Sequence, residues 1–154
     1  ELLLYTTLVH IGNQEYKTAK KYISNAIIDH NIKYLPLMRT IRLVRLIVFY
    51  EVQEHELIQY ESRSITRSLS SPKEQTFKTE RIILWFLNKR NIPILKKDRE
   101  AFWEKLSPEI HELYNNKYES QLLRLFDFTA WMESKIRKEK LSEVLRARAS
   151  AKEC

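Results

Sequence analysis

The residues that most often carry chemistry in proteins are sparse and scattered in this sequence. The four histidines, His10, His30, His55 and His111, lie far apart, and none belongs to an H-E-x-x-H motif or to a pair one helical turn apart. The single cysteine, Cys154, has no second thiol with which to form a disulfide or a cysteine-based metal site. The spacing therefore predicts no metal site.

Motifs for nucleotide binding and for nucleophilic catalysis are also missing. A phosphate-binding loop needs several glycines, and Gly12 is the only one in the chain. No G-x-S-x-G elbow is present to activate a serine. Glu51 and Glu54 lie one helical turn apart, but their place at a break between helices favours contacts with solvent or with a helix end over acid–base chemistry. We expect neither an enzyme activity nor a cofactor.

Cations with a regular spacing are the strongest candidates for binding. Three arginines recur every third residue on a segment that is otherwise nearly apolar: Arg39, Arg42 and Arg45. A guanidinium group pairs with a carboxylate through two parallel hydrogen bonds, so this band could hold an acidic peptide. In the alternative interpretation these cations cover a solvated face or pair with acids of the same chain, such as Glu51, Glu61 and Glu80.

A second basic band lies further along the chain. Lys78, Arg81 and Trp85 follow the i, i+3, i+7 spacing that places side chains on one face of a helix. Two cations beside an aromatic ring would extend a contact surface for a carboxylate-bearing partner. We predict that the two bands together form the partner-binding site, with the same alternative of a solvated charged face.

The composition favours a folded, all-helical chain. Of the 154 residues, 44% are hydrophobic and 11% aromatic, which is enough to build a core. One glycine cannot supply the positive-φ positions of hairpin turns, so sheet-rich folds are disfavoured. The net charge of +7 permits an acidic partner without requiring one. No stretch approaches the roughly 20 apolar residues of a membrane span, and the lone cysteine favours a cytoplasmic location.

Periodicity and breaks in the pattern predict about seven helices joined by short connections. The third is apolar nearly all round and should be a central helix with neighbours on both sides. Ser71, Pro72 and Glu74 form a capping box that opens the fifth. Pro108 either kinks the sixth or restarts it. The predicted helices cover about residues 2–11, 15–29, 36–52, 56–69, 72–88, from 98 onward, and from 118 to beyond 145.

The segment around the second helix resembles a tetratricopeptide repeat. That repeat has an aromatic, a small, a bulky and a second small residue at fixed spacing, which here are Tyr16, Ala19, Ile23 and Ala26. A shift of 41 residues places Leu57, Tyr60, Ser64 and Arg67 on the corresponding positions. This period is longer than the 34 residues of the standard repeat, and the proline that closes the standard unit is displaced to Pro36.

The resemblance implies a right-handed stack of about three antiparallel helical hairpins over residues 1–115. It also implies that the third and fifth helices line a concave groove for a peptide partner. Residues 116–149 would form one long capping helix with Trp131 as a core anchor, and residues 150–154 a frayed tail. We expect one domain, 1–154, that belongs to a longer protein with more domains upstream.

These observations predict a scaffold that binds a protein or peptide partner, for which the basic bands allow an acidic one, and performs no catalysis. Two other functions stay open. A helical repeat with Lys and Arg along a groove can bind nucleic acid, although here 20 acidic residues dilute the 27 basic ones. The third possibility is a structural or self-associating module, with the long final helix as the dimer face.

Overall fold

The computed structural model describes residues 2–26, 35–69, 77–88 and 92–152, and this part of the chain is all α-helical. It contains nine helices where the sequence predicts about seven. No strand occurs in the described ranges, in line with the scarcity of glycine. The residues divide into two compact units, 1–87 and 88–154.

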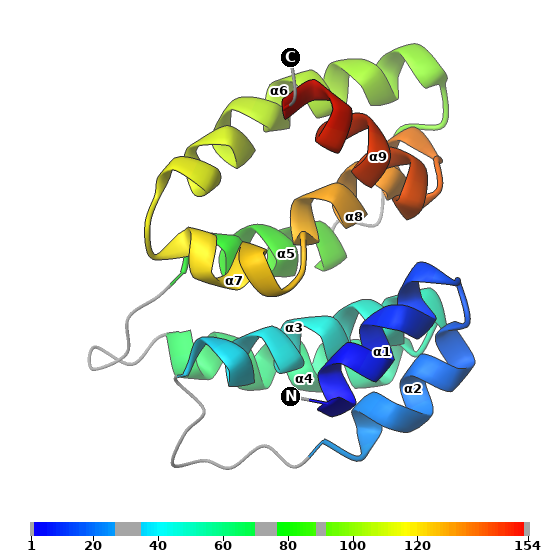
Figure 1. The fold of residues 1–154 in the computed structure, drawn as a ribbon, viewed down its shortest axis with the longest axis vertical. Coiled ribbons are helices and arrows are strands. Elements are labelled where there is room, and N and C mark those ends of the chain that lie inside the picture. Colours follow the sequence, from blue (N-terminus) through cyan, green and yellow to red (C-terminus); the bar gives the residue numbers. More distant parts are fainter. Residues whose placement is uncertain (1, 27–34, 70–76, 89–91, 153–154) are drawn as a thin grey trace. The chain divides into compact units, whose positions relative to one another are not determined.

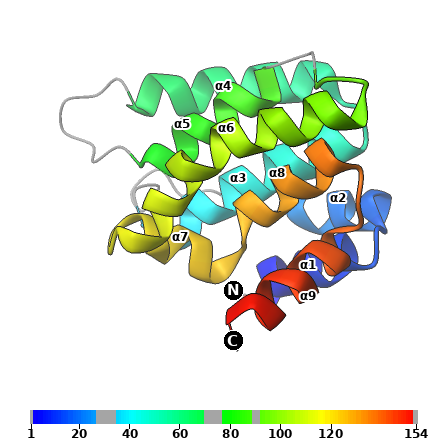
Figure 2. The same cartoon turned by 90° about the horizontal axis from the view of Figure 1, so that it is seen from above.

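The first unit contains five helices, shown from blue to green in Figure 1. Its helices are α1 (Leu2–Gly12), α2 (Tyr16–Ser24), α3 (Pro36–Glu51), α4 (His55–Leu69) and α5 (Lys78–Asn88). Within this unit α3 packs against α2 on one side and α4 on the other (Figure 2). The predicted central helix is therefore confirmed.

The sequence of α3 explains both its position and its start. Leu43, Val44, Leu46, Ile47 and Val48 are all completely buried, as expected of a helix whose apolar residues surround its axis. Pro36 occupies the first turn, where its missing N–H leaves no hydrogen bond unmade. Such a helix can only be stable with neighbours on several sides.

The end of α2 differs from the prediction, which extends this helix to residue 29. The helix ends at Ser24, and residues 27–34 lie outside the described part of the chain. Arg45 of α3 donates hydrogen bonds from Nη2 to the carbonyl oxygens of Ile23 (3.3 Å) and Ala26 (2.7 Å). A cation at this position satisfies carbonyl groups that the end of a helix leaves without partners.

The turns of this unit use glutamine where glycine would be expected. Gln14 between α1 and α2 has φ 62°, and Gln53 between α3 and α4 has φ 63°, whereas Gly12 is the last residue of α1 and has no positive φ. At the start of α5, the predicted capping box at residues 71–74 lies outside the described residues. The described helix begins at Lys78.

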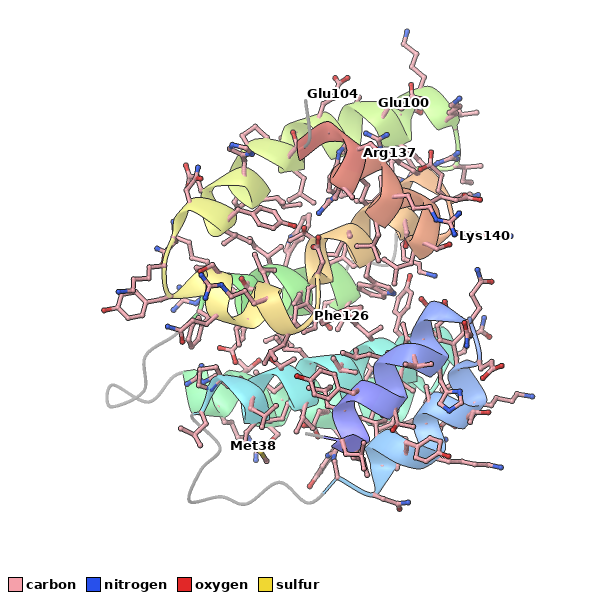
Figure 3. The ribbon with its side chains drawn as sticks, in the orientation of Figure 1. Met38, Glu100, Glu104, Phe126, Arg137 and Lys140 are labelled. Atoms are coloured by element: carbon pink, nitrogen blue, oxygen red, sulfur yellow. The ribbon has the colours of Figure 1, made fainter. Side chains whose placement is uncertain are left out.

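The second unit corrects the prediction of one long capping helix over residues 116–149. After α6 (Lys96–Asn115) the chain forms three shorter helices, α7 (Glu119–Leu125), α8 (Phe128–Arg137) and α9 (Leu141–Lys152). Figure 3 labels Phe126 at the turn between α7 and α8. Residues 150–152, expected to be frayed, belong to α9.

Two local causes break the predicted helix. Phe126 is extended (φ −154°), and the Asp127 side chain accepts a hydrogen bond from the Ala130 N–H at 2.9 Å, which starts α8. Lys138 adopts the left-handed conformation (φ 60°, ψ 42°) and ends α8.

Pro108, in contrast, neither ends nor restarts α6, which is continuous through it. Trp131 is buried, as predicted for a core anchor.

The positions that resemble a tetratricopeptide repeat differ in their environments. Ala19 and Ile23 are completely buried, whereas their counterparts Tyr60 and Ser64 are exposed on α4. A repeat places equivalent residues in equivalent contacts. The two sets of positions therefore do not play the same part in packing.

Candidate functional site

The first predicted binding residue, Arg39, points into the first unit. Its Nη1 donates to the Glu80 carboxylate at 2.7 Å, and each side chain is only 5% exposed. The guanidinium group also lies 5.0 Å from the centre of the Phe77 ring. Burial raises the pKa of Glu80, and Arg39 offsets this only in part. This pair attaches α5 to α3.

Arg42 is also committed to contacts within the chain. Its Nε lies 3.4 Å from the Glu61 carboxylate and its Nη2 donates to the Ser64 hydroxyl at 3.2 Å, both on α4. Arg42 and Glu61 are buried. Arg39 and Arg42 thus pair with acids of the same chain, Glu80 and Glu61, as the alternative interpretation predicts. Arg45 instead binds the end of α2. The arginine band does not line an open groove.

The second predicted band is at the surface. Lys78, Arg81 and Trp85 are exposed on α5, with the Trp85 side chain 44% exposed. The residues between them on the helix, Ile82 and Ile83 among them, are buried. The i, i+3, i+7 spacing therefore identified an outward face correctly, although the band stands apart from the inward arginines of α3.

A group of lysines on α2 forms a basic hollow that is not among the predicted binding residues. Lys17, Lys20 and Lys21 follow one another at i, i+3, i+4, the spacing of a shared helix face. With Ser24, Val52 and Glu54 they line a hollow of about 450 Å³, which we call the lysine hollow. The spacing was visible in the sequence, but only the fold brings the turn after α3 against it.

The charges of the lysine hollow are unequally compensated. Lys20 pairs with Glu54 at 2.5 Å, which places Glu54 in a solvent-facing contact as expected from the sequence. Lys17 and Lys21 are exposed, and among the described residues neither has an acidic partner. The hollow thus combines two solvated ammonium groups with the Ser24 hydroxyl, a set that suits an anionic ligand.

The second unit contains a dense polar cluster around Arg148 of α9, which we call the Arg148 cluster. Nη1 of Arg148 donates to the Tyr114 hydroxyl (2.7 Å), to Thr129 Oγ1 (2.8 Å) and to Asp127 Oδ2 (3.1 Å). Nε and Nη2 donate to one carboxylate oxygen of Glu133 at 2.9 and 2.6 Å. One guanidinium group thereby joins α9 to α6 and α8.

An aromatic ring and a second arginine complete the Arg148 cluster. The guanidinium carbon of Arg148 lies 5.9 Å from the centre of the Trp103 ring, and that of Arg137 lies 6.0 Å from it. Arg137, labelled in Figure 3, also pairs with Glu133 at 3.0 Å. Burial and the nearby Asp127 carboxylate raise the pKa of Tyr114 to about 12, so its hydroxyl stays neutral near pH 7.

Comparison with protein-family models, curated proteins and solved structures finds no match to this chain. In the described ranges, no group of three or more His, Cys, Asp or Glu side chains is placed to hold a metal ion. None of the described helices is both long and apolar enough to cross a membrane. The candidate sites therefore rest on geometry and charge: the lysine hollow, the face of α5 and the Arg148 cluster.

Proposed function

We propose that this chain is a protein-interaction module that binds an acidic segment of a partner protein. The observation that carries the proposal is the lysine hollow, where Lys17 and Lys21 are solvated and have no acidic partner in the described part of the chain. An ammonium group is a compact charge on a flexible stem, so such a surface fits carboxylates without demanding one fixed geometry. The exposed α5 face is a second contact of the same sign.

The test uses a fluorescein-labelled oligo-glutamate peptide and the double variant Lys17→Glu/Lys21→Glu. Reversing both charges should weaken binding by about tenfold or more, which corresponds to roughly 1.4 kcal/mol. The matched control is Lys97→Glu/Lys105→Glu, which makes the same change in net charge at exposed positions of α6. Equal losses in both double variants would mean that only overall charge matters, and would contradict the proposal.

The contribution of α5 is tested separately. Arg81→Glu reverses an exposed charge and should weaken peptide binding by a few-fold. Reversing Arg42 is not a suitable test, because it would leave Glu61 without its buried partner and destabilise the fold.

A single-stranded RNA oligonucleotide serves as the competing ligand. Tighter binding of RNA than of the peptide at equal salt would favour the nucleic-acid alternative.

A second candidate function, self-association, is favoured by the outer face of α1. Leu2, Tyr5 and Val9 are exposed at i, i+3, i+7, and no Asp, Glu, Lys or Arg occurs within this helix. Sedimentation equilibrium should then show a dimer that Tyr5→Glu converts to monomer. Tyr60→Glu, which changes an exposed tyrosine of α4, is the matched control. A wild-type chain that stays monomeric at high concentration would exclude this function.

A further inference from the structure

The Arg148 cluster has the composition of a receptor for a guanidinium group. Two carboxylates contact the group, Glu133 at Nε and Nη2 and Asp127 at Nη1. The hydroxyls of Tyr114 and Thr129 also accept from Nη1, and the Trp103 ring is within cation–π distance. Each of the three nitrogens of Arg148 donates to at least one of these residues. An ammonium group could not match so many acceptors at once.

The receptor residues are positioned by contacts that do not involve Arg148. Asp127 accepts hydrogen bonds from Ala130 N at 2.9 Å, from Thr129 Oγ1 at 2.8 Å and from the Tyr114 hydroxyl at 2.7 Å. Glu133 is paired with Arg137 on its other oxygen. These contacts lie within α6 and α8 and the N-cap of α8, so the receptor should keep its shape when the Arg148 side chain leaves.

The helix that delivers Arg148 is attached by little apolar surface. Of the α9 side chains that the structure describes, Val144 is the one buried apolar residue, whereas Leu145 is 40% exposed. Arg146 and the two alanines that flank Arg148, Ala147 and Ala149, are exposed. The polar contacts of Arg148 therefore supply much of what holds α9, and elements held by few buried apolar contacts open at low cost.

We propose that Tyr114, Asp127, Thr129, Glu133 and Trp103 form a binding site for the guanidinium group of an arginine in a partner protein. Arg148 occupies this site from within the chain, and the partner's arginine replaces it as α9 detaches. The charge balance supports this exchange, because removal of Arg148 leaves two carboxylates facing one cation, Arg137. The site is separate from the lysine hollow, which selects the opposite charge.

The first experiment removes the internal occupant in the full chain. Arg148→Ala should bind acetylarginine amide saturably, with a Kd on the order of 1 mM, because a single side chain makes few contacts. The resonance of the Trp103 indole N–H reports the binding. Wild type should bind far more weakly, since Arg148 competes at the high effective concentration of a tethered group. Acetyllysine amide should bind several-fold more weakly than the arginine compound.

Arg146→Ala removes an exposed arginine of the same helix and should behave as wild type. In wild type, high concentrations of acetylarginine amide should speed amide hydrogen exchange in α9 and leave α6 unchanged, a result that does not depend on how Arg148→Ala folds. Absence of this acceleration, or equal binding of the lysine and arginine compounds by Arg148→Ala, would overturn the proposal.

Discussion

Arginine–carboxylate contacts hold both units together, but in different surroundings. In the first unit Arg39 and Glu80 form one buried pair, with each side chain 5% exposed. In the second unit Arg148 and Asp127 are each 23% exposed, and several acceptors share the guanidinium group. The first pair is sealed between α3 and α5, whereas the second cluster borders solvent.

The pKa shifts of the two groups reflect this difference in exposure. Burial raises the pKa of Glu80, and the attraction of Arg39 does not offset it, so the buried carboxylate is incompletely compensated. For Arg148, burial by itself lowers the pKa, but the surrounding acceptors, Asp127 first and Glu133 among them, raise it, and the net result is a raised pKa. The stability of the sealed Arg39–Glu80 pair thus depends strictly on both partners. The open Arg148 cluster has several acceptors, so it can lose or exchange one of its contacts.

The largest expected effect comes from breaking the sealed pair. Arg39→Ala leaves Glu80 buried without its cation and should lower the free energy of unfolding by about 3–5 kcal/mol. The double variant Arg39→Met/Glu80→Leu should lose much less, because apolar residues can fill the same space. Urea denaturation followed by circular dichroism measures both. A loss below about 1 kcal/mol in Arg39→Ala would place this pair with ordinary surface ion pairs.

Removing Arg148 should have a smaller effect on stability. We expect Arg148→Ala to lower the free energy of unfolding by about 2 kcal/mol, since several charge-assisted hydrogen bonds are lost but Asp127 can reach water. Urea denaturation of Arg148→Ala beside Arg146→Ala, which should stay within about 0.5 kcal/mol of wild type, measures the difference. A loss equal to that of Arg39→Ala would remove the distinction between sealed and open clusters.

The raised pKa of Glu80 also predicts a pH dependence of the sealed pair. The folded chain keeps a proton on Glu80 at pH values where the unfolded chain has lost it, so this contribution to stability is complete below the ordinary pKa of 4.5. It decreases as the pH rises through the raised value. Wild type should therefore lose stability relative to Arg39→Met/Glu80→Leu as the pH increases from 4.5. A difference that is constant with pH would argue against the raised pKa.

A helix with apolar residues on all sides could be predicted from the sequence. The apolar residues of α3 surround its axis, and the helix is central in its unit. The spacing of Lys78, Arg81 and Trp85 also gave the exposed face of α5. The direction of Arg39 and Arg42 could not be predicted, because the choice between solvent and a buried acid depends on where α4 and α5 lie.

The breaks between α7, α8 and α9 were missed because their residues look helical. Lys138 is a good helix former, yet it takes the left-handed conformation that normally favours glycine. Gln14 and Gln53 do the same in the first unit. Asp127 carried a usable signal, since aspartate is a preferred N-cap, but the apolar positions on both sides of it concealed the break.

The smallest predicted effect concerns the joint that connects α8 to the helix carrying Arg148. Lys138→Gly should raise the free energy of unfolding by up to about 1 kcal/mol, because a side chain at φ 60° is strained and glycine is not. Lys105→Gly, at an exposed position inside α6, should lower it by about the same amount. Urea denaturation should thus give opposite signs for the two glycine variants. Hydrogen exchange in α9 provides a second measurement on Lys138→Gly. Unchanged exchange would mean that the attachment of α9 depends on Arg148 and Val144 and not on the turn. Slower exchange would show that the turn contributes.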